Sequence, residues 1–217
     1  MIQNATEPLL EIRRVTKRFP GVRALHGVSL HVNPGEVVAV IGENGAGKST
    51  LMKILAGVEG PDEGELIWQG RPVRIESVHQ ALDLGIALIH QELNLADNLD
   101  VAANIFLGRE PHRFGLIRTS LLHREASRLL ELIQLDVSPD TPLSELTIGR
   151  QQMVEIAMAL SVNARVLIMD EPTSSLSGHE AEALFRVVQQ LRDQGVSVIS
   201  LSRRLGEVNV LADRVVV

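Results

Sequence analysis

The chain has 217 residues, enough for one large domain with a sizeable core, and its 45% hydrophobic and 22% charged residues are typical of a globular protein. Its 27 acidic and 21 basic residues give a net charge of −6, which disfavours broad binding to nucleic acid, so no nucleic-acid partner is expected. The absence of cysteine excludes a disulfide framework and thiolate metal sites, and no apolar run approaches the ~20 residues that cross a bilayer. The N-terminal residues lack a basic segment followed by an apolar core, so we expect a cytoplasmic protein.

The first predicted elements are strands at residues 9–15 and 28–32, with a turn at residues 19–21 between them. Phe19 lies upstream of a glycine-rich loop, where an aromatic ring could stack on an adenine. Aromatic side chains are more often packed in a core, so the residues alone favour packing in a small β-layer. A further short strand is predicted at residues 65–69, and its Trp68 is interpreted as a packing residue.

The most informative stretch is residues 42–50, GENGAGKST, which fits the pattern G-x-x-x-x-G-K-[ST]. An apolar run at 37–41 precedes it and a helix-like segment at 51–56 follows, which is the order strand, loop, helix of a phosphate-binding P-loop. The glycines let successive N–H groups turn toward one anion, and the helix start adds its positive end. A glycine turn that only links strand and helix is the alternative, which the length of the pattern disfavours.

We therefore expect a nucleoside triphosphate at this loop. Lys48 would neutralise the β- and γ-phosphates, and the Ser49 hydroxyl would join the coordination sphere of Mg²⁺. The candidate phosphate-binding residues are Gly42, Glu43, Asn44, Gly45, Ala46, Gly47, Lys48, Ser49 and Thr50.

Three later stretches carry weaker signals. Gln91 follows an apolar strand at 86–89, where polar side chains of an α/β sheet meet ligands, although a surface glutamine is the alternative. Thr147 and Gly149 open a helix with an apolar stripe, whose N–H groups could bind an anion or simply start an amphipathic helix. Before it, residues 97–142 are predicted to be an inserted helical section, with an apolar stripe at Leu122, Ala126, Leu129, Leu130 and Ile133.

The strand predicted at 165–169 ends in Asp170 and Glu171. Two carboxylates after a buried strand can present one to a metal and the other to a water, and the P-loop in the same chain favours this function over simple turn chemistry. Ser177 and Glu180 have capping-box spacing and predict the start of a helix that ends near Gly195. Strands are predicted at 196–201 and 214–217.

The combination resembles the ATP-binding-cassette (ABC) ATPases, and more narrowly the N-terminal cassette of ATPase subunits of bacterial simple-sugar importers of the ribose, xylose or galactose type. The resemblance covers about residues 9–217. It rests on KRFPGVRAL, GENGAGKSTLMKILAG, HQELNL, LTIGRQQMVEIAMAL, LIMDEPTSSLS and ADRVVV, in that order. It implies an α/β P-loop NTPase of ABC type in a single domain, 1–217. This domain would have a RecA-like mixed sheet core, an antiparallel β-subdomain and an inserted α-helical subdomain at about 92–163.

The resemblance also implies roles for several residues. Phe19 would stack on adenine, against the interpretation from the residues alone. Thr147 and Gly149 align with the signature that closes over the γ-phosphate of a partner cassette's ATP. The implied metal ligands are Ser49, Gln91 and Asp170, and the implied catalytic residues are Glu171, Lys48, Gln91 and Arg203.

Arg203 departs from the family pattern, because it stands where a switch histidine is expected. A permanently charged guanidinium can pair with Glu171, whereas a neutral imidazole can bridge phosphate and water. A nucleotide-binding but hydrolysis-poor cassette is therefore the alternative to an active ATPase. Arg203 could instead act as a cation on the γ-phosphate.

The implied function is ATP hydrolysis with Mg²⁺ that couples cassette dimerisation to sugar uptake. The implied partners are a second cassette, a transmembrane permease and, indirectly, a periplasmic sugar-binding protein. The expected location is the cytoplasmic face of the membrane. Members of the subgroup continue into a second cassette beyond the strand at 214–217. We therefore expect either a fragment of a longer protein or pairing with a separate chain.

Overall fold

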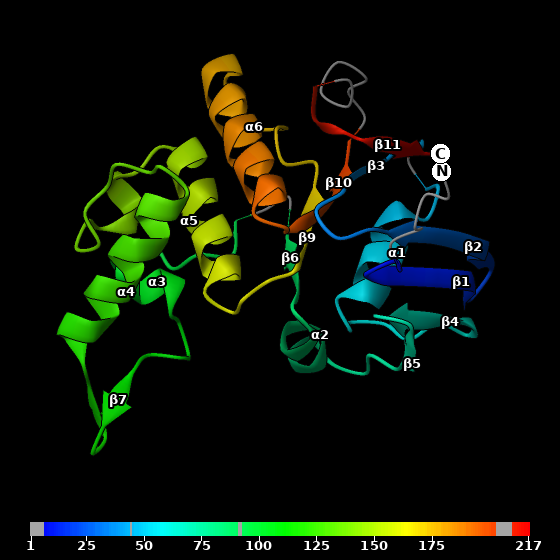
Figure 1. The fold of residues 1–217 in the computed structure, drawn as a ribbon, viewed down its shortest axis with the longest axis horizontal. Helices are drawn as coiled ribbons and strands as arrows, with labels where there is room; N and C mark the ends of the chain where they lie inside the picture. Colours follow the sequence, from blue (N-terminus) through cyan, green and yellow to red (C-terminus); the bar gives the residue numbers. More distant parts are fainter. Residues whose placement is uncertain (1–6, 44, 91–92, 203–209) are drawn as a thin grey trace, which may run out of the picture.

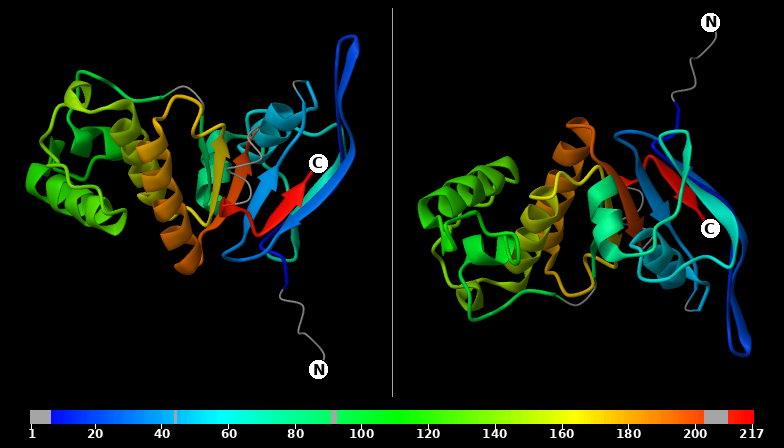
Figure 2. Two further views of the ribbon diagram at one scale, coloured as in Figure 1. Left: turned by 90° about the horizontal axis from the view of Figure 1, so that it is seen from above. Right: turned by 90° about the horizontal axis from the view of Figure 1, so that it is seen from below.

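The computed structural model describes residues 7–43, 45–90, 93–202 and 210–217. A four-stranded antiparallel sheet is built from β1 (Leu10–Phe19), β2 (Val22–Val32), β4 (Glu63–Trp68) and β5 (Arg71–Val73), in the order β2-β1-β4-β5. The strands β1 and β2 form a long hairpin that extends to one side of the molecule (Figure 2). The strand β2 begins at Val22, earlier than the predicted residue 28. The prediction missed this outer half of the hairpin because it is largely exposed and lacks a clear apolar pattern.

A second, parallel sheet forms the centre of the fold (Figure 1). Its strands are β3 (Val37–Val40), β6 (Ile86–Ile89), β9 (Val166–Asp170), β10 (Ser197–Leu201) and β11 (Arg214–Val216), in the order β11-β3-β10-β9-β6. Every residue of β3 and of β10 is buried. Such near-continuous apolar runs are typical of parallel strands that are covered on both faces. Together the two sheets confirm the predicted α/β architecture.

The helices form two groups, one packed around the parallel sheet and the other in a separate layer beside it (Figures 1 and 2). Near the sheet lie α1 (Lys48–Leu55), α2 (Val78–Leu84) and α6 (Gly178–Asp193). The other layer contains α3 (Val101–Ile105), α4 (Thr119–Leu132), α5 (Ile148–Leu160) and the 3-10 turn Leu143–Glu145. A small hairpin, β7 (His112–Arg113) and β8 (Leu116–Ile117), projects between α3 and α4. In the described residues, no helix is long and apolar enough to span a membrane.

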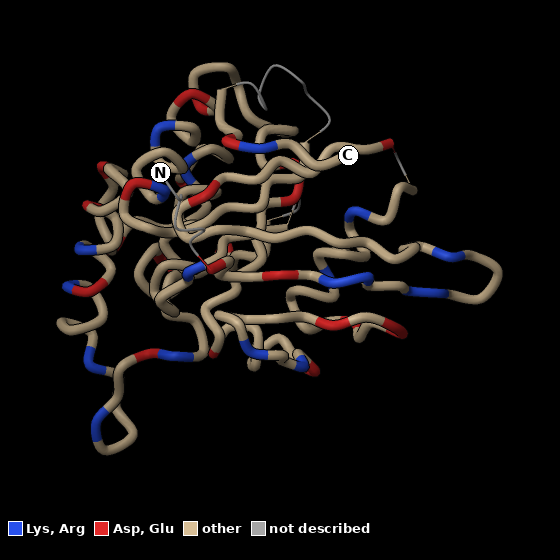
Figure 3. The backbone as a smooth tube through the Cα atoms, turned by 45° about the vertical axis from the view of Figure 1, so that its right-hand side comes forward, with Lys and Arg blue, Asp and Glu red and all other residues tan. Residues whose placement is uncertain are grey.

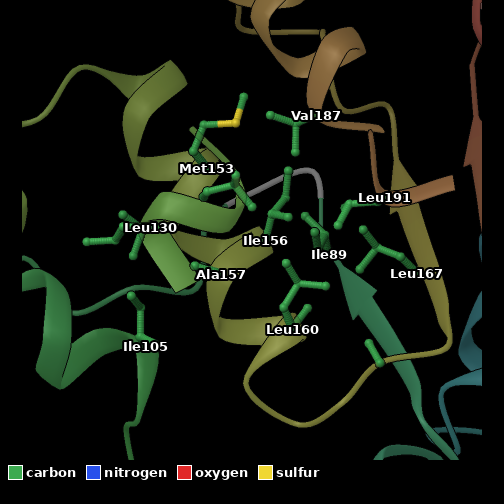
Figure 4. Close-up of a cluster of buried hydrophobic side chains, with 14 of the residues drawn as sticks. Ile89, Ile105, Leu130, Met153, Ile156, Ala157, Leu160, Leu167, Val187 and Leu191 are labelled. Carbon is green, nitrogen blue, oxygen red and sulfur yellow. The ribbon is translucent and has the colours of Figure 1, made fainter. Parts of the chain in front are cut away.

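Most of the predicted stripe on α4 is confirmed, since Leu122, Ala126 and Leu130 are buried, as is Ile133 directly after the helix. The remaining member, Leu129, is half-buried and packs against the same core. These side chains belong to a core cluster that joins the helical layer to the parallel sheet (Figure 4). Its labelled members include residues of α3, α4 and α5 together with Ile89 of β6 and Leu167 of β9. The helical layer is therefore held to the sheet by a shared core.

A second core cluster fills the space between the parallel sheet, α1 and the antiparallel sheet. Leu167 belongs to the first cluster and its neighbour Ile168 to the second, because successive strand residues point to opposite faces. Trp68 is 7% exposed and lies in the second cluster, which confirms its interpretation as a packing residue.

Glu155 of α5 is an ionisable side chain in the interior, with 7% of its surface exposed. Its Oε1 accepts a hydrogen bond of 2.7 Å from the backbone N–H of Asn94. Its Oε2 is buried and has no hydrogen-bond partner in the part of the chain that the structure describes. Burial raises the pKa of Glu155 to about 7, and the bond from Asn94 opposes this only in part. The folded chain therefore favours the protonated carboxyl.

We predict that the substitution Glu155→Gln makes stability less dependent on pH. The unfolded carboxyl titrates near 4.3, so the wild-type chain loses stability as pH rises from about 4.3 to about 7 and loses no more above that. Glutamine keeps an oxygen for the Asn94 N–H and has no charge to bury. The stability of the variant relative to wild type should therefore rise by up to about 3 kcal/mol between pH 4.5 and pH 8, measured by urea unfolding.

The matched control is Glu131→Gln, which removes an exposed carboxylate from α4. Its stability relative to wild type should be nearly equal at the two pH values. An equal difference at both pH values for Glu155→Gln as well would contradict the raised pKa.

Candidate functional site

The candidate site lies at the carboxyl edge of the parallel sheet. In the register of the three neighbouring strands, Leu201 of β10 pairs with both Val40 of β3 and Asp170 of β9. The loop that follows β3 is the glycine-rich segment at 42–50. Because neighbouring strands are about 4.8 Å apart, the start of this loop and Asp170 are separated by roughly 10 Å across β10. Loop and carboxylate are thus brought together, at the edge where open α/β sheets bind ligands.

Two other candidates follow strands that end at the same edge. Ile89 at the end of β6 pairs with Met169 of β9, and Gln91 comes two residues later. Arg203 follows β10 and Ser202. Gln91, Arg203 and the loop residue Asn44 lie outside the described residues, so their side-chain roles stay predictions.

The glycines of the loop are required by its conformation and by its neighbours. Gly45 and Gly47 have φ of 84° and 86°, in the left-handed region that favours glycine. A Cβ on Gly47 would lie 2.2 Å from the carbonyl oxygen of Ala24 and 2.7 Å from Leu25 Cδ2. The strand β2 therefore packs directly on the loop, and no side chain fits at position 47.

Lys48 is the first residue of α1, and its side chain folds back across the loop. Its Nζ donates hydrogen bonds to the carbonyl oxygens of Gly42, at 2.5 Å, and Glu43, at 2.9 Å. The ammonium group is therefore held at the mouth of the loop by two carbonyls.

The start of α1 has no side-chain cap. Its N-cap residue, Gly47, has no side chain, and its first turn contains no acidic residue. The starts of α2, α3, α5 and α6 each have a capping side-chain oxygen, from Ser77, Asp100, Thr147 and Ser177, whereas α4, like α1, has none. The first N–H groups of α1 are therefore left for another acceptor, and the helix dipole favours an anion there. Ser49, which is exposed, and Thr50, which is half-buried, lie in this first turn.

Asp170 and Glu171 mark an abrupt end of β9. Asp170 is the last residue of the strand and is half-buried. Glu171 has φ of 46°, which is uncommon for a residue other than glycine and costs about 1 kcal/mol or more. Its backbone N–H donates to the carbonyl oxygen of Leu201, at 3.0 Å. The backbone of Glu171 is thus anchored to β10, next to the strand that carries the glycine loop.

Phe19 lies at the tip of the β1–β2 hairpin, where it pairs with Val22, and its side chain is 37% exposed. The ammonium of Lys17 lies 5.6 Å from the centroid of its ring. The hairpin touches the glycine loop through Ala24 and Leu25. Adenine stacking by the Phe19 ring stays a prediction. Figure 3 shows basic residues on both strands of this hairpin, and three of them, Arg13, Lys17 and Arg18, pair with carboxylates.

Thr147 and Gly149 are at the start of α5, in the helical layer and not beside α1 (Figures 1 and 2). The Thr147 hydroxyl accepts from the Arg150 N–H, at 3.4 Å, and so caps the helix. It also donates to Glu180 Oε1, at 3.0 Å, across 33 residues of sequence. Sequence reasoning identified Glu180 only as a capping-box residue and missed this contact, because spacing along one helix says nothing about a second helix.

The family model described as ABC transporter matches residues 25–174. The ribose import ATP-binding protein RbsA of Rhodopirellula baltica is 54% identical over 210 residues, which are 96% of this chain and 41% of the relative. The arabinose import ATP-binding protein AraG of Pectobacterium atrosepticum is 47% identical over 213 residues, 98% of this chain and 42% of the relative. The chain thus spans about two fifths of the length of the curated relatives it matches.

Solved structures show the same fold. A nucleotide-free ATP-binding cassette from an ABC transporter is 27% identical, with a TM-score of 0.82 over 95% of this chain and 85% of the other. The ADP conformation of MJ1267, an ATP-binding cassette of an ABC transporter, is also 27% identical, with a TM-score of 0.80 over 94% and 85%. The family match covers more than half of the chain, and the edge of the parallel sheet carries the loop and the carboxylates that its motifs predict. The chain therefore belongs to the ABC transporter family.

Proposed function

We propose that the chain binds ATP at the carboxyl edge of its parallel sheet and hydrolyses it, and that this drives uptake of a sugar or a similar small solute. The observation that carries the proposal is the uncapped start of α1, at Lys48. The strand β3, which leads into the glycine loop, is separated from the strand that ends in Asp170 only by β10. Relatives named as ribose and arabinose import ATP-binding proteins support the coupling to sugar import. Because the chain spans about two fifths of those relatives, the transport activity belongs to the proposal.

In the proposed complex the loop residues 42–50 hold the phosphates. The N–H groups at the start of α1 donate to phosphate oxygens, as uncapped helix starts do. Lys48 exchanges the carbonyls of Gly42 and Glu43 for the β- and γ-phosphates, which are stronger, charged acceptors. Phe19 stacks on the adenine ring.

Mg²⁺ is the proposed cofactor, with the Ser49 hydroxyl, Asp170 and Gln91 as its protein ligands. In the part of the chain that the structure describes, no three His, Asp or Glu side chains are grouped so that they could hold a metal. The small set formed by Ser49, Asp170 and Gln91 suits Mg²⁺, because this ion keeps several waters and takes much of its coordination from substrate phosphates. When bound, the ion would offset the charge that develops on the phosphates.

Glu171 is the proposed catalytic carboxylate, which would orient and polarise the attacking water. Gln91 and Arg203 are proposed to act around the γ-phosphate, on sequence grounds. The hydrolysis-poor alternative, which rests on Arg203, has no support from the fold or from the relatives.

A second cassette is the proposed partner for catalysis. The start of α5, which contains Thr147 and Gly149, lies away from α1 of the same chain, which suits a role at the nucleotide held by a partner. The remaining partners in the proposal are a transmembrane permease that contacts the helical subdomain, at about 92–163, and indirectly a periplasmic sugar-binding protein. The chain would then lie at the cytoplasmic face of the membrane. Acidic and basic residues are interspersed along the chain in Figure 3, and the net charge is −6. Both features favour these protein partners over a nucleic-acid partner.

We predict that Lys48→Ala weakens ATP binding roughly 10- to 100-fold, because hydrogen bonds to charged phosphates contribute about 1.5–3 kcal/mol. Lys53→Ala is the matched control, since Lys53 is exposed in the last turn of the same helix. Isothermal titration calorimetry with ATP and Mg²⁺ measures both affinities. If the two variants bind ATP equally well, the loop is not the phosphate site.

We further predict that Glu171→Gln leaves ATP affinity within about twofold of wild type and lowers the rate of phosphate release on the order of a hundredfold or more. Glutamine can still contact a water but cannot accept its proton. The rate is measured at protein concentrations high enough for cassettes to pair, with Glu131→Gln as the control. An undiminished rate would assign the chemistry to another group.

A further inference from the structure

One carboxylate, that of Glu180, is shared by the starts of two helices. Its Oε2 accepts from the backbone N–H of Ser177, at 3.0 Å, and from the Ser177 hydroxyl, at 2.7 Å. Its Oε1 accepts from the Thr147 hydroxyl, at 3.0 Å. Ser177 is the N-cap of α6 and Thr147 the N-cap of α5. The two oxygens of Glu180 thus serve different helices.

The two capping hydroxyls have matching roles. The Thr147 oxygen accepts from the N–H of Arg150, and the Ser177 oxygen accepts from the N–H of Glu180, each at 3.4 Å. Each hydroxyl also donates a hydrogen bond to the Glu180 carboxylate. A capping box for α6 alone needs only the contacts with Ser177. The contact with Thr147 is an addition that capping does not require.

Gly149 makes the close approach of the two helices feasible. Its backbone lies beside the Glu180 carboxylate and favours the charged form of that group. A Cβ at position 149 would lie 2.6 Å from Oε1 and 2.7 Å from the carboxyl carbon, so a larger residue would push the carboxylate away. The hydrogen bonds from Ser177, then that from Thr147, hold the pKa of Glu180 below its usual range, and the nearby Gly149 backbone adds to this. At neutral pH the group is a carboxylate, which accepts from both hydroxyls and from the Ser177 N–H.

The loop between Glu171 and α6 is compact. The Ser174 N–H donates to the carbonyl oxygen of Glu171, at 3.1 Å, and the Leu176 N–H donates to that of Thr173, at 3.2 Å. Ser177 follows directly and is bound to Glu180. A short, hydrogen-bonded segment therefore connects Glu171 to the shared carboxylate.

We propose that Glu180 is a positioning residue that locks the start of α5 to the start of α6, so that Thr147 and Gly149 move together with the loop that carries Glu171. The inference rests on the proposed function for its catalytic consequence. Thr147 and Gly149 would meet the nucleotide of a second cassette. A movement of the start of α5 when that nucleotide binds is then passed through Glu180 to the loop that carries the catalytic carboxylate of this chain.

The link itself is tested by hydrogen exchange of the chain without nucleotide, comparing three variants. Glu180→Ala should speed exchange of the amides at the starts of both α5 and α6 by about tenfold, as expected when charged hydrogen bonds are lost. Ser177→Ala should speed exchange at the start of α6 only. Glu182→Ala removes an exposed carboxylate from the same helix, near His179, and should match wild type. Unchanged protection at the start of α5 in Glu180→Ala would overturn the proposal.

Protection of the buried strands β3 and β10 reports whether a variant is folded. If Glu180→Ala does not fold, Glu180→Gln takes its place, because it keeps the side-chain length and one acceptor oxygen. That oxygen can serve one helix start but not both. Faster exchange at one of the two starts is then the expected result, and full protection at both would overturn the proposal.

The catalytic consequence is tested by steady-state ATP hydrolysis. Glu180→Ala should lower kcat by about tenfold with KM unchanged, because the glycine loop and Lys48 are untouched. A wild-type chain that neither binds nor hydrolyses ATP would overturn the proposed function, while hydrogen exchange would still decide whether Glu180 links the helices. Loss of protection at α5 with unchanged kcat would show that the contact is structural, which would overturn the positioning role.

Discussion

The register of three parallel strands is the constraint on which the rest of the structure depends. It aligns Val40, Leu201 and Asp170 in neighbouring strands, so the glycine loop and the carboxylate come to one edge although they are far apart in sequence. The register is held because alternate residues of these strands fill two different cores. A shift of β9 by one residue would exchange the environments of Leu167 and Ile168 and would also displace Asp170.

Two helix starts in this chain differ in whether an anionic group of the chain already contacts them. The start of α1 has glycine as its N-cap and no acidic residue in its first turn, so its N–H groups are available to a phosphate. The start of α5 is already in contact with an anion, the Glu180 carboxylate of the same chain. One chain thus combines a start open to ligand with a start tied to its own α6.

Much of this fold and of the glycine loop could be predicted from the sequence, because their signals are local. The apolar runs predict β3, β9 and β10, and the glycine pattern between strand and helix predicts the loop around Lys48. The capping box of α6 is confirmed for the same reason. The hairpin β7–β8 and the short helix α2 were not predicted, because neither has enough residues to show a period. The contact of Glu180 with Thr147 depends on how two helices pack, which no local pattern contains.

The central claim is that the phosphates of a nucleotide, rather than its base, are bound by the loop at 42–50 and the first turn of α1. Backbone amide resonances of Gly45, Gly47 and Lys48, followed by NMR during separate titrations with ATP, inorganic triphosphate and adenosine, test it most directly. The account predicts large shifts of these three resonances with ATP and with triphosphate, and small shifts with adenosine. Shifts that are equally large with adenosine, or that avoid the loop in the presence of ATP, would contradict it.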